Sequence, residues 1–356
     1  MSDPTASGSL LASEQRSTDL ELAIAARPSA FRVLTGDRPT GPLHIGHYFG
    51  TLENRVRLQA AGVDLMVLIA DYQVMTDRTM PAGLAGDVLG QIADYLAVGI
   101  DPGRATIFAH SQVAALNQLL LPFLSLVSVA EVGRNPTVKD EMAAAGSAVI
   151  TALMFSYPVH QAADILFCHA NVVPVGKDQL PHVELTRSIA RRFNDRYSPG
   201  QPYFPEPQAL LSAAPLLLGL DGRKMSKSLG NTVPIRATSD ETAALVGAAR
   251  TDAERVISYE PERRPEVSNL LLIAALCRDV APQELAGEIG AGGSAALKAM
   301  VTDAINERFA SIRSRRQELA GDADYLRAVL ADGNERASVI ATSTMNTVRE
   351  LMHTRY

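Results

Sequence analysis

The chain has 356 residues, a formal net charge of −6 and 47% hydrophobic residues, with a mean hydropathy of +0.04. This length fits one large domain with an appendage, or two domains, and the apolar content supports a sizeable core. No apolar run reaches the roughly 18 residues that cross a bilayer, and no secretion signal is evident, so we expect a cytoplasmic protein with no membrane partner.

The charge and the cysteines exclude further classes of protein. A net negative charge argues against a protein coated in positive charge for nucleic acid, although a local basic face stays compatible with it. Cys168 and Cys277 belong to no Cys-x-x-Cys pair and have few other soft ligands nearby. We therefore expect neither a disulfide framework nor a bound metal.

The first third of the chain alternates strands with helices after a polar start. Residues 1–29 are rich in Ser, Thr, Ala and Asp and are predicted to be a mobile extension, in which residues 20–26 can form a short helix. Strands are expected at residues 31–35, 64–70 and 105–109, and helices at residues 42–59 and 81–98. This alternation predicts a parallel α/β sheet with right-handed crossovers.

The middle of the chain is predicted to carry a helical insertion on this sheet. The insertion spans about residues 113–150 and includes a polar loop at residues 133–139. A strand is then expected at residues 172–175 and a helix at residues 179–194.

The last third reads as helices separated by Pro265, Pro282 and a glycine cluster. We therefore expect a Rossmann-like parallel sheet domain over residues 30–234 and an all-helical domain over residues 235–356.

The segment Pro42-Leu43-His44-Ile45-Gly46-His47 carries the first chemical signature. Pro42 suits the first turn of a helix, and His44 and His47 then share one face of that turn. A helix N-terminus offers unpaired N–H groups and positive potential, which suit phosphate, and Gly46 leaves space for a purine or ribose. Taken alone, the histidines are equally compatible with surface positions on a capped helix.

The second signature is Lys224-Met225-Ser226-Lys227-Ser228, which is flanked by glycines. Its two lysines can close over a triphosphate and stabilise charge on a departing pyrophosphate, and its serines add hydroxyl donors. A solvated basic loop is the usual interpretation of such a lysine pair on its own.

The two signatures, in this order and this far apart, resemble the hallmark pair of the class I aminoacyl-tRNA synthetases. No P-loop, dinucleotide fingerprint or nucleophile elbow accompanies them. Adenylate formation requires none of these, because a substrate carboxylate attacks the α-phosphate directly. The resemblance implies ATP as a substrate and Mg²⁺ as its companion. The implied catalytic residues are His44, His47, Lys224, Ser226 and Lys227.

Polar side chains in the middle of the chain predict an amino-acid pocket. Tyr157, Gln161 and Asp164 fall on a single face of one predicted helix, and the surrounding segment is mostly apolar. A carboxylate there can accept a hydrogen bond from an indole N–H, while Tyr157 and Gln161 can contact an α-ammonium group. A buried helix whose polar groups are satisfied by backbone is the alternative.

Residues 157–166, 173–179 and 182–187 resemble the amino-acid-binding segments of tryptophanyl-tRNA synthetases, within a resemblance that covers most of residues 31–356. It implies that Asp164 recognises the indole nitrogen and that Gln179 helps to hold the amino acid. The implied tryptophan-binding residues are Gly36, Gln73, Tyr157, Gln161, Asp164 and Gln179. The implied ATP-binding residues are Arg38, Pro39, Thr40, Gly46, His47, Gly176, Lys177, Asp178, Leu217, Lys224, Met225, Ser226, Lys227 and Ser228.

The resemblance also implies the partners and the reaction. The expected enzyme activates L-tryptophan with ATP and transfers it to tRNA(Trp), and it works as a homodimer joined through the insertion. Residues 235–356 would then bind the anticodon, with Arg308, Arg313, Arg315 and Arg316 as candidates along one predicted helix. A solvated charged face is the alternative for these arginines.

Three other functions stay open. A tyrosyl-tRNA synthetase has a pocket with Tyr, Gln and Asp at similar spacing, although the sequence around Asp164 favours tryptophan. A non-catalytic tRNA-binding or regulatory paralogue is disfavoured by the intact histidines and lysines of the two signatures. A small-molecule nucleotidyltransferase is disfavoured by the long helical tail.

Overall fold

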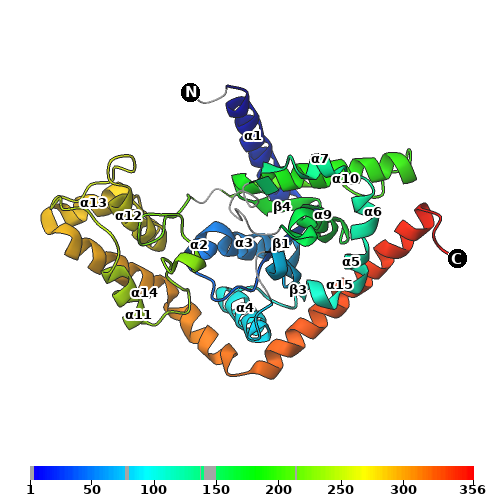
Figure 1. Cartoon of the computed structure of the whole chain (residues 1–356). Helices are drawn as coiled ribbons and strands as arrows, with labels where there is room; N and C mark the ends of the chain where they lie inside the picture. The colour runs from blue at the N-terminus through cyan, green and yellow to red at the C-terminus, as the bar shows by residue number, and fades with distance from the viewer. Residues whose placement is uncertain (1–3, 77–79, 137, 140–149, 213–214) are drawn as a thin grey trace.

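A computed structural model of the chain describes residues 4–76, 80–136, 138–139, 150–212 and 215–356, without the side chains of residues 4–12 and Ser228. Its centre is a parallel five-stranded sheet in the order β3-β2-β1-β4-β5 (Figure 1). The strands are β1 (Arg32–Asp37), β2 (Asp64–Ile69), β3 (Ala105–Ala109), β4 (Val172–Val175) and β5 (Gln208–Leu211). The expected parallel α/β fold is therefore confirmed.

Four strands match the predicted apolar runs because continuous hydrophobic residues suit a strand that is covered on both faces. β5 was not predicted. It has four residues, of which only Leu210 is buried, so its sequence carries little signal.

The strand order places a switch point between β1 and β4. β1 joins β2 through six paired positions, from Arg32 with Asp64 to Asp37 with Ile69, but joins β4 only through Val33 and Val172. Beyond Val33 the two strands separate toward their carboxyl ends. In open parallel sheets ligands bind at this edge, where the strand order reverses.

Helices cover the sheet and extend beyond it. Those before β4 are α1 (Pro4–Ala26), α2 (Ile45–His47), α3 (Glu53–Ala61), α4 (Leu84–Val98), α5 (Ala114–Gln118), α6 (Leu120–Leu124), α7 (Val129–Val132) and α9 (Ala152–Leu166). Those after it are α10 (Leu180–Tyr197), α11 (Ser239–Gly247), α12 (Pro265–Arg278), α13 (Pro282–Ile289), α14 (Gly293–Ala320) and α15 (Ala323–Leu351). No helix of the described residues is long and apolar enough to span a membrane.

The N-terminal segment differs from its prediction. Instead of a mobile extension, α1 is a helix that packs on β5. Leu20 and Ile24 are buried against the core, and the Ser17 hydroxyl accepts a hydrogen bond of 2.9 Å from the Leu211 N–H. The segment is rich in Ser, Thr and Ala, which explains why its composition suggested disorder.

The described part of the predicted insertion contains several short helices. Residues 114–132 form the three short helices α5, α6 and α7, and α9 begins at Ala152. Part of the polar loop and the following segment, residues 137 and 140–149, lie outside the described residues.

The C-terminal helices α14 and α15 pack against elements of the sheet domain and do not form a wholly separate unit. α14 runs from the group α11–α13 to α4, and α15 follows β3 and α5 (Figure 1). Gly333 of α15 touches the strand so closely that a Cβ there would lie 1.8 Å from the Ile107 carbonyl oxygen. The Ala109 N–H at this sheet edge donates to Asn334 Oδ1 at 3.0 Å. The proposed limits at residues 30–234 and 235–356 thus divide residues that share a core.

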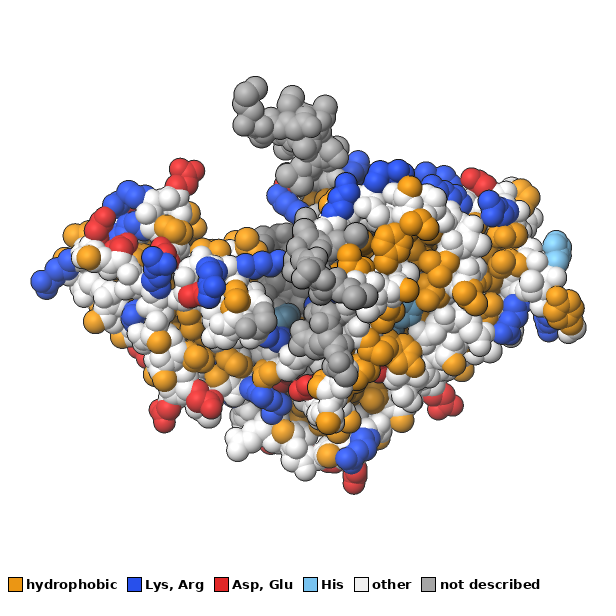
Figure 2. Space-filling model, viewed as in Figure 1, with side chains coloured by type: hydrophobic (Ala, Val, Ile, Leu, Met, Phe, Trp, Pro, Cys, Tyr) orange, Lys and Arg blue, Asp and Glu red, His pale blue; other side chains and the backbone are white. Residues whose placement is uncertain are grey.

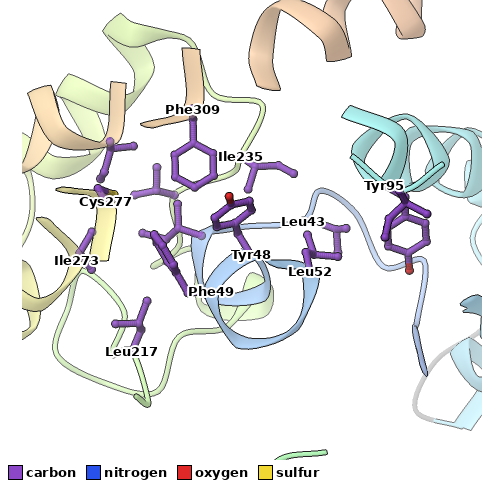
Figure 3. Close-up of a cluster of buried hydrophobic side chains, with 14 of the residues drawn as sticks. Leu43, Tyr48, Phe49, Leu52, Tyr95, Leu217, Ile235, Ile273, Cys277 and Phe309 are labelled. Carbon is purple, nitrogen blue, oxygen red and sulfur yellow. The ribbon is translucent and has the colours of Figure 1, made fainter. Parts of the chain in front are cut away.

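A second core joins α14 to the segment after the histidine signature. Residues Tyr48–Leu52 form a π-helical turn between α2 and α3, and such turns are frequent at functional sites. Phe309 of α14 packs edge-on against Tyr48, with ring centroids 4.8 Å apart, and against Phe49 (Figure 3). This cluster joins the helical region to the segment that follows the histidine signature.

Candidate functional site

A cavity of about 340 Å³ lies at the carboxyl ends of β1 and β4. Its position is the switch point of the sheet, where the separated strands leave room for a ligand. The residues expected to bind the amino acid all line it: Gly36, Gln73, Tyr157, Gln161, Asp164 and Gln179. Arg38 and Gly176, which were expected to contact ATP, line it as well. The structure thus gathers these sequence-distant residues around one space.

The floor of the cavity is a buried carboxylate. Asp164 is 1% exposed, and its Oδ1 lies 2.7 Å from Nε2 of His110, which is fully buried. Gln73 Nε2 approaches the other oxygen at 3.4 Å, a weak donor contact. His110 was not identified from the sequence. Its place directly after β3, at the same sheet edge as β1 and β4, is the signal that could have found it.

A second histidine completes this floor. His160 precedes Asp164 by one turn of α9, and its Nε2 lies 2.8 Å from Asn117 Oδ1. Potential ligand atoms of His110, His160 and Asp164 lie within 4.8 Å of one another. Side chains already join these groups in pairs, His110 with Asp164 and His160 with Asn117, and burial lowers the pKa of His160. The group therefore forms a hydrogen-bonded base for the cavity.

The predicted face of α9 is present. Tyr157, Gln161 and Asp164 all point to the cavity, as their spacing indicated. The Tyr157 hydroxyl lies 3.4 Å from His182 Nε2 on α10, and burial lowers the pKa of His182 to about 4. The His182 imidazole beside Tyr157 is therefore neutral at pH 7.

Gly36 lines the cavity but also serves the sheet. A Cβ there would lie 2.4 Å from the Leu68 carbonyl oxygen on β2, so a side chain would push the two strands apart. The glycine therefore permits close strand packing at the edge of the cavity.

The histidine signature begins its helix later than predicted. α2 starts at Ile45, so Pro42 precedes the helix and His44 is its N-cap residue. An antiparallel bridge between His44 and Pro234 delays the helix, because the Ile45 N–H donates to the Val233 carbonyl and the Ile235 N–H donates to the Leu43 carbonyl. The histidine signature is thus joined by backbone to the segment that follows the lysine signature.

The two histidines lie against each other. Their ring centroids are 3.8 Å apart, and the His44 N–H donates to His47 Nδ1 at 3.2 Å. Burial, with the charges of His47 and Lys227, lowers the pKa of His44 to about 3. Burial also lowers the pKa of His47 to about 4, against the opposing charge of Asp37. Both rings are therefore neutral at pH 7 and can donate or accept a hydrogen bond.

The lysine signature meets the histidine signature directly. Lys227 Nζ donates to the Gly41 carbonyl at 2.8 Å, across 186 residues of sequence. A Cβ on Gly46 would lie 2.8 Å from Met225 Sδ, so the two signatures pack without space for a larger residue. Burial lowers the pKa of Lys227. The ammonium group is close enough to His44 and His47 for its charge to lower the pKa of both histidines. The structure therefore has the expected convergence of the two signatures.

Asn231 holds the turn that carries the lysines. Its Oδ1 accepts from the Ser226 N–H at 2.9 Å, and its Nδ2 donates to Asp221 at 2.7 Å and to the Lys224 carbonyl at 3.1 Å. Asn231 is buried, whereas Lys224 is exposed. The sequence suggested no role for this asparagine, because its partners surround it only after the turn forms. The side chain of Ser228 lies outside the described part.

The other residues expected to contact ATP lie around this junction. Pro39 and Thr40 form the turn that links Arg38 to the histidine signature, and the Thr40 N–H donates to the Arg38 carbonyl at 2.9 Å. Asp178 folds back toward Gly176, where a Cβ would lie 2.7 Å from its Oδ1.

Two of the expected ATP contacts are placed differently. Lys177 is exposed and pairs with Glu14 of α1 at 2.8 Å, a partner that the sequence could not indicate because α1 was expected to be mobile. Leu217 is buried with Phe49 and Ile273 in the core (Figure 3). A contact between Leu217 and ATP would therefore use its backbone.

A buried ion pair lies in the lining of the cavity, and its carboxylate is close to His47. Arg55 is 1% exposed, and its guanidinium donates to Asp37 Oδ2 at 2.7 Å, while the Tyr95 hydroxyl donates to the same oxygen at 2.8 Å. Burial favours a higher pKa for Asp37, but Arg55, His47 and Tyr95 together hold that pKa below its ordinary value. The pair is thus a fixed, charged wall that sequence analysis missed.

The arginines expected to contact tRNA are mostly turned inward. Arg308 pairs with Glu53 at 2.5 Å, Arg313 donates to Asn306 and Thr242, and Arg316 pairs with Asp94 at 2.8 Å. Of the four, Arg315 makes no hydrogen bond or ion pair to the described residues. Arg308, Arg313 and Arg316 thus link α14 to other parts of the protein, and a contact of these arginines with tRNA stays a prediction.

The chain is similar to known proteins over most of its length. A family profile described as "tRNA synthetases class I (W and Y)" matches residues 27–310. A tryptophan–tRNA ligase of Streptococcus agalactiae is 39% identical over 336 residues, which cover 91% of this chain and 98% of the relative. The tryptophan–tRNA ligase of Clostridium longisporum is 37% identical over 333 residues, with coverage of 91% and 97%. The crystal structure of tryptophanyl-tRNA synthetase from Campylobacter jejuni, complexed with ADP and tryptophan, has a TM-score of 0.79 at 31% identity, covering 91% of this chain and 100% of that one.

Proposed function

The chain belongs to the class I tRNA synthetases of the tryptophan and tyrosine type, and on this premise we propose that it is a tryptophan–tRNA ligase. The carboxylate of tryptophan attacks the α-phosphate of ATP, which releases pyrophosphate and forms tryptophanyl-adenylate. A hydroxyl at the 3′ end of tRNA(Trp) then attacks the acyl carbon, and AMP leaves.

One observation carries this proposal: the buried Asp164 carboxylate lines a cavity that also includes Asp37 and Arg38, from the segment that leads into the histidine signature. The indole N–H donates to Asp164, whose orientation His110 fixes. Tyr157, Gln161 and Gln179 surround the α-ammonium group. The structure from Campylobacter jejuni with ADP and tryptophan bound supports the same division between a nucleotide and an amino-acid subsite.

The chemistry in this proposal is electrostatic. Two anions, a carboxylate and a phosphate, must approach each other, so the site supplies cations and hydrogen-bond donors for the charge that moves to the pyrophosphate. Lys227 and Lys224 provide the charge, and the neutral His44 and His47 provide donors that need no desolvation of a cation. Lys227 leaves the Gly41 carbonyl to reach the phosphates.

Mg²⁺ enters this site with ATP. The buried group of His110, His160 and Asp164 does not fit it, because Mg²⁺ prefers oxygen ligands and keeps several waters. The phosphates would therefore supply most of its ligands, and the ion would neutralise their charge.

The proposed assembly is a homodimer that binds one class of tRNA and acts in the cytoplasm. Hydrophobic side chains gather over α6 and α9 in Figure 2. Leu121 of α6 and Val129 of α7 are 75% and 77% exposed. Exposed apolar residues of this size in neighbouring elements are typical of an interface. tRNA would contact the helical region. Arg308, Arg313 and Arg316 would take part in this contact only after leaving their present partners.

Exchange of labelled pyrophosphate into ATP tests the function. Purified protein should catalyse exchange with tryptophan, and with tyrosine at a kcat/KM lower by about 10⁴ or more, because Asp164 would be left without the indole N–H. Charging of tRNA(Trp) should follow. Exchange that depends on tyrosine instead, or no exchange with any amino acid, would contradict the proposal.

A further inference from the structure

Asp94 is a buried carboxylate that lies outside the cavity and outside both signatures. It is on α4, 1% exposed, and both of its oxygens are used. Oδ2 accepts a hydrogen bond from the Leu43 N–H at 3.2 Å, and Oδ1 accepts one from Arg316 Nε at 2.8 Å. Three elements that are far apart in sequence thus meet at one side chain.

The bond to Leu43 acts on the histidine signature itself. Leu43 immediately precedes His44, and its carbonyl accepts a hydrogen bond from the Ile235 N–H at 3.0 Å. The peptide groups on both sides of Leu43 are therefore fixed, one by Asp94 and the other by Ile235. Since His44 has an extended backbone as the N-cap of α2, its direction depends on how Leu43 is held.

Asp94 also lies close to the lysine signature. Burial lowers the pKa of Lys227, and the charge of Asp94 is among those that oppose this effect. Asp94 therefore acts on both signatures. It accepts a backbone hydrogen bond from Leu43 of the histidine signature, and its negative charge acts on Lys227 of the lysine signature.

Arg316 brings in the helical region. It lies near the end of α14, whose other end packs with α11 and α12, and its side chain is 16% exposed against 2% for Asp94. The same helix contacts the segment after the histidines through Phe309 and Tyr48. A shift of α14 would therefore reach Leu43 through Asp94 and reach the π-helical turn through Phe309.

We propose that Asp94 and Arg316 are a positioning pair, through which α14 holds the main chain of the histidine signature in its nucleotide-binding geometry. The pair touches no substrate. It acts through Leu43, and an error of 1 Å in such a support is enough to lower a reaction rate by about a hundredfold. The inference rests on the proposed function for its substrate, ATP, but not on the identity of the amino acid.

Four variants test the pair. Arg316→Met removes the charge and keeps the length of the side chain, and Arg316→Lys restores a cation. Asp94→Asn keeps an acceptor for Leu43 but weakens the link to Arg316. Lys298→Met is the matched control, because it removes a cation from the same helix at a side chain that bonds to the Gly247 carbonyl, away from Asp94.

The measurements are KM for ATP, KM for tryptophan and kcat in pyrophosphate exchange, together with the Kd for ATP by calorimetry. Arg316→Met should weaken ATP binding or lower kcat by about tenfold to a hundredfold, with KM for tryptophan within about twofold. Arg316→Lys should recover part of the loss, and Lys298→Met should match the parent protein. Equal changes in both KM values, or no change at all, would overturn the proposal.

The double variant distinguishes a loss of activity caused by unfolding from one caused by lost positioning. Asp94→Asn with Arg316→Met leaves no unpaired buried charge, so it should fold even if Arg316→Met alone does not, as circular dichroism would show. If the double variant is folded and binds ATP like the parent protein, the pair has only a structural role and the proposal is wrong. If the parent protein lacks exchange but the variants weaken ATP binding, the proposed function fails and the positioning pair stands.

Discussion

His110 and Asp164 share a hydrogen bond of 2.7 Å, although one follows a strand and the other lies on a helix, and neither side chain is reached by solvent. The imidazole occupies one carboxylate oxygen and leaves the other toward the cavity, where Gln73 is only a weak partner at 3.4 Å. A carboxylate held in this way can read a single donor on a ligand.

Replacing His110 should reduce the ability of the site to recognise the indole N–H. We expect His110→Leu to lower the preference for tryptophan over a benzothiophene analogue by about tenfold or more, because the freed carboxylate can rotate away. His110→Gln keeps a donor and should retain most of the preference. The measurement is the ratio of kcat/KM values for the two amino acids in pyrophosphate exchange. An unchanged ratio in His110→Leu would contradict a role for His110 in orienting Asp164.

Removing the cation of Lys227 should affect the rate more than tryptophan binding. We expect Lys227→Ala to lower kcat in pyrophosphate exchange by about 10²–10³, since its charge would act chiefly in the transition state. KM for tryptophan should stay within about twofold. Lys298→Ala is the control, because Lys298 is on α14 and bonds only to the Gly247 carbonyl. A rise in KM for tryptophan with an unchanged kcat would show that Lys227 serves the amino acid instead.

Acid should destabilise the protein through its signature histidines. The pKa values of His44 and His47, about 3 and about 4, lie below the ordinary value of 6.5. Between these limits the unfolded chain binds more protons than the folded one, so the free energy of unfolding falls as the pH drops below about 6.5. Urea unfolding at pH 7.5 and pH 5 measures the slope. The variant His44→Asn should show a smaller loss between these pH values than the parent protein; an equal loss would exclude His44 as a cause.

A methyl group at Gly333 should loosen the contact between α15 and β3. The new Cβ would lie 1.8 Å from the Ile107 carbonyl oxygen, a backbone atom that cannot rotate away. We expect Gly333→Ala to lower the free energy of unfolding by about 1–3 kcal/mol. Gly287→Ala on α13 is the matched control, because no atom lies within 4 Å of a Cβ there, and it should be neutral or stabilising. Chemical denaturation compares the two, and similar stabilities would argue against this close approach.

Charges on the exposed apolar face should separate the proposed dimer. Leu121→Lys with Val129→Glu changes two side chains that are already 75% and 77% exposed, so folding should be little affected. We expect the sedimentation coefficient to fall from that of a dimer to that of a monomer. Val339→Lys, at an exposed position on α15, should leave the assembly unchanged. A dimer that survives the first change would move the interface elsewhere.

Sequence patterns predicted those parts of the fold that local hydrophobicity determines. The runs at β2 and β3 are continuously apolar, and α9 presents Tyr157, Gln161 and Asp164 on one face, so both strand and pocket could be inferred from spacing. β5 and α1 were missed because β5 is short and is held by pairing with β4, while α1 packs on β5 through a few residues of a segment rich in Ser, Thr and Ala.

The remaining features depend on partners that only the folded chain brings together. Arg316 has the same local sequence pattern as Arg315, yet one is paired with a buried carboxylate and the other is exposed. His110 and Asp164 are 54 residues apart, and no periodicity relates them. Such pairs depend on the strand order and on the packing of the helices. Local patterns in a single sequence do not indicate either one.

The edge of β3 has a consequence for synthesis of the chain. The Ala109 N–H finds its acceptor on Asn334, 225 residues later. While the ribosome is still translating the helical region, this strand has an uncovered row of backbone donors beside the nascent pocket, and such an edge can pair with other chains. Full protection arrives only when α15 emerges, so a nascent chain stalled before that helix exposes the edge strand for the whole of the pause.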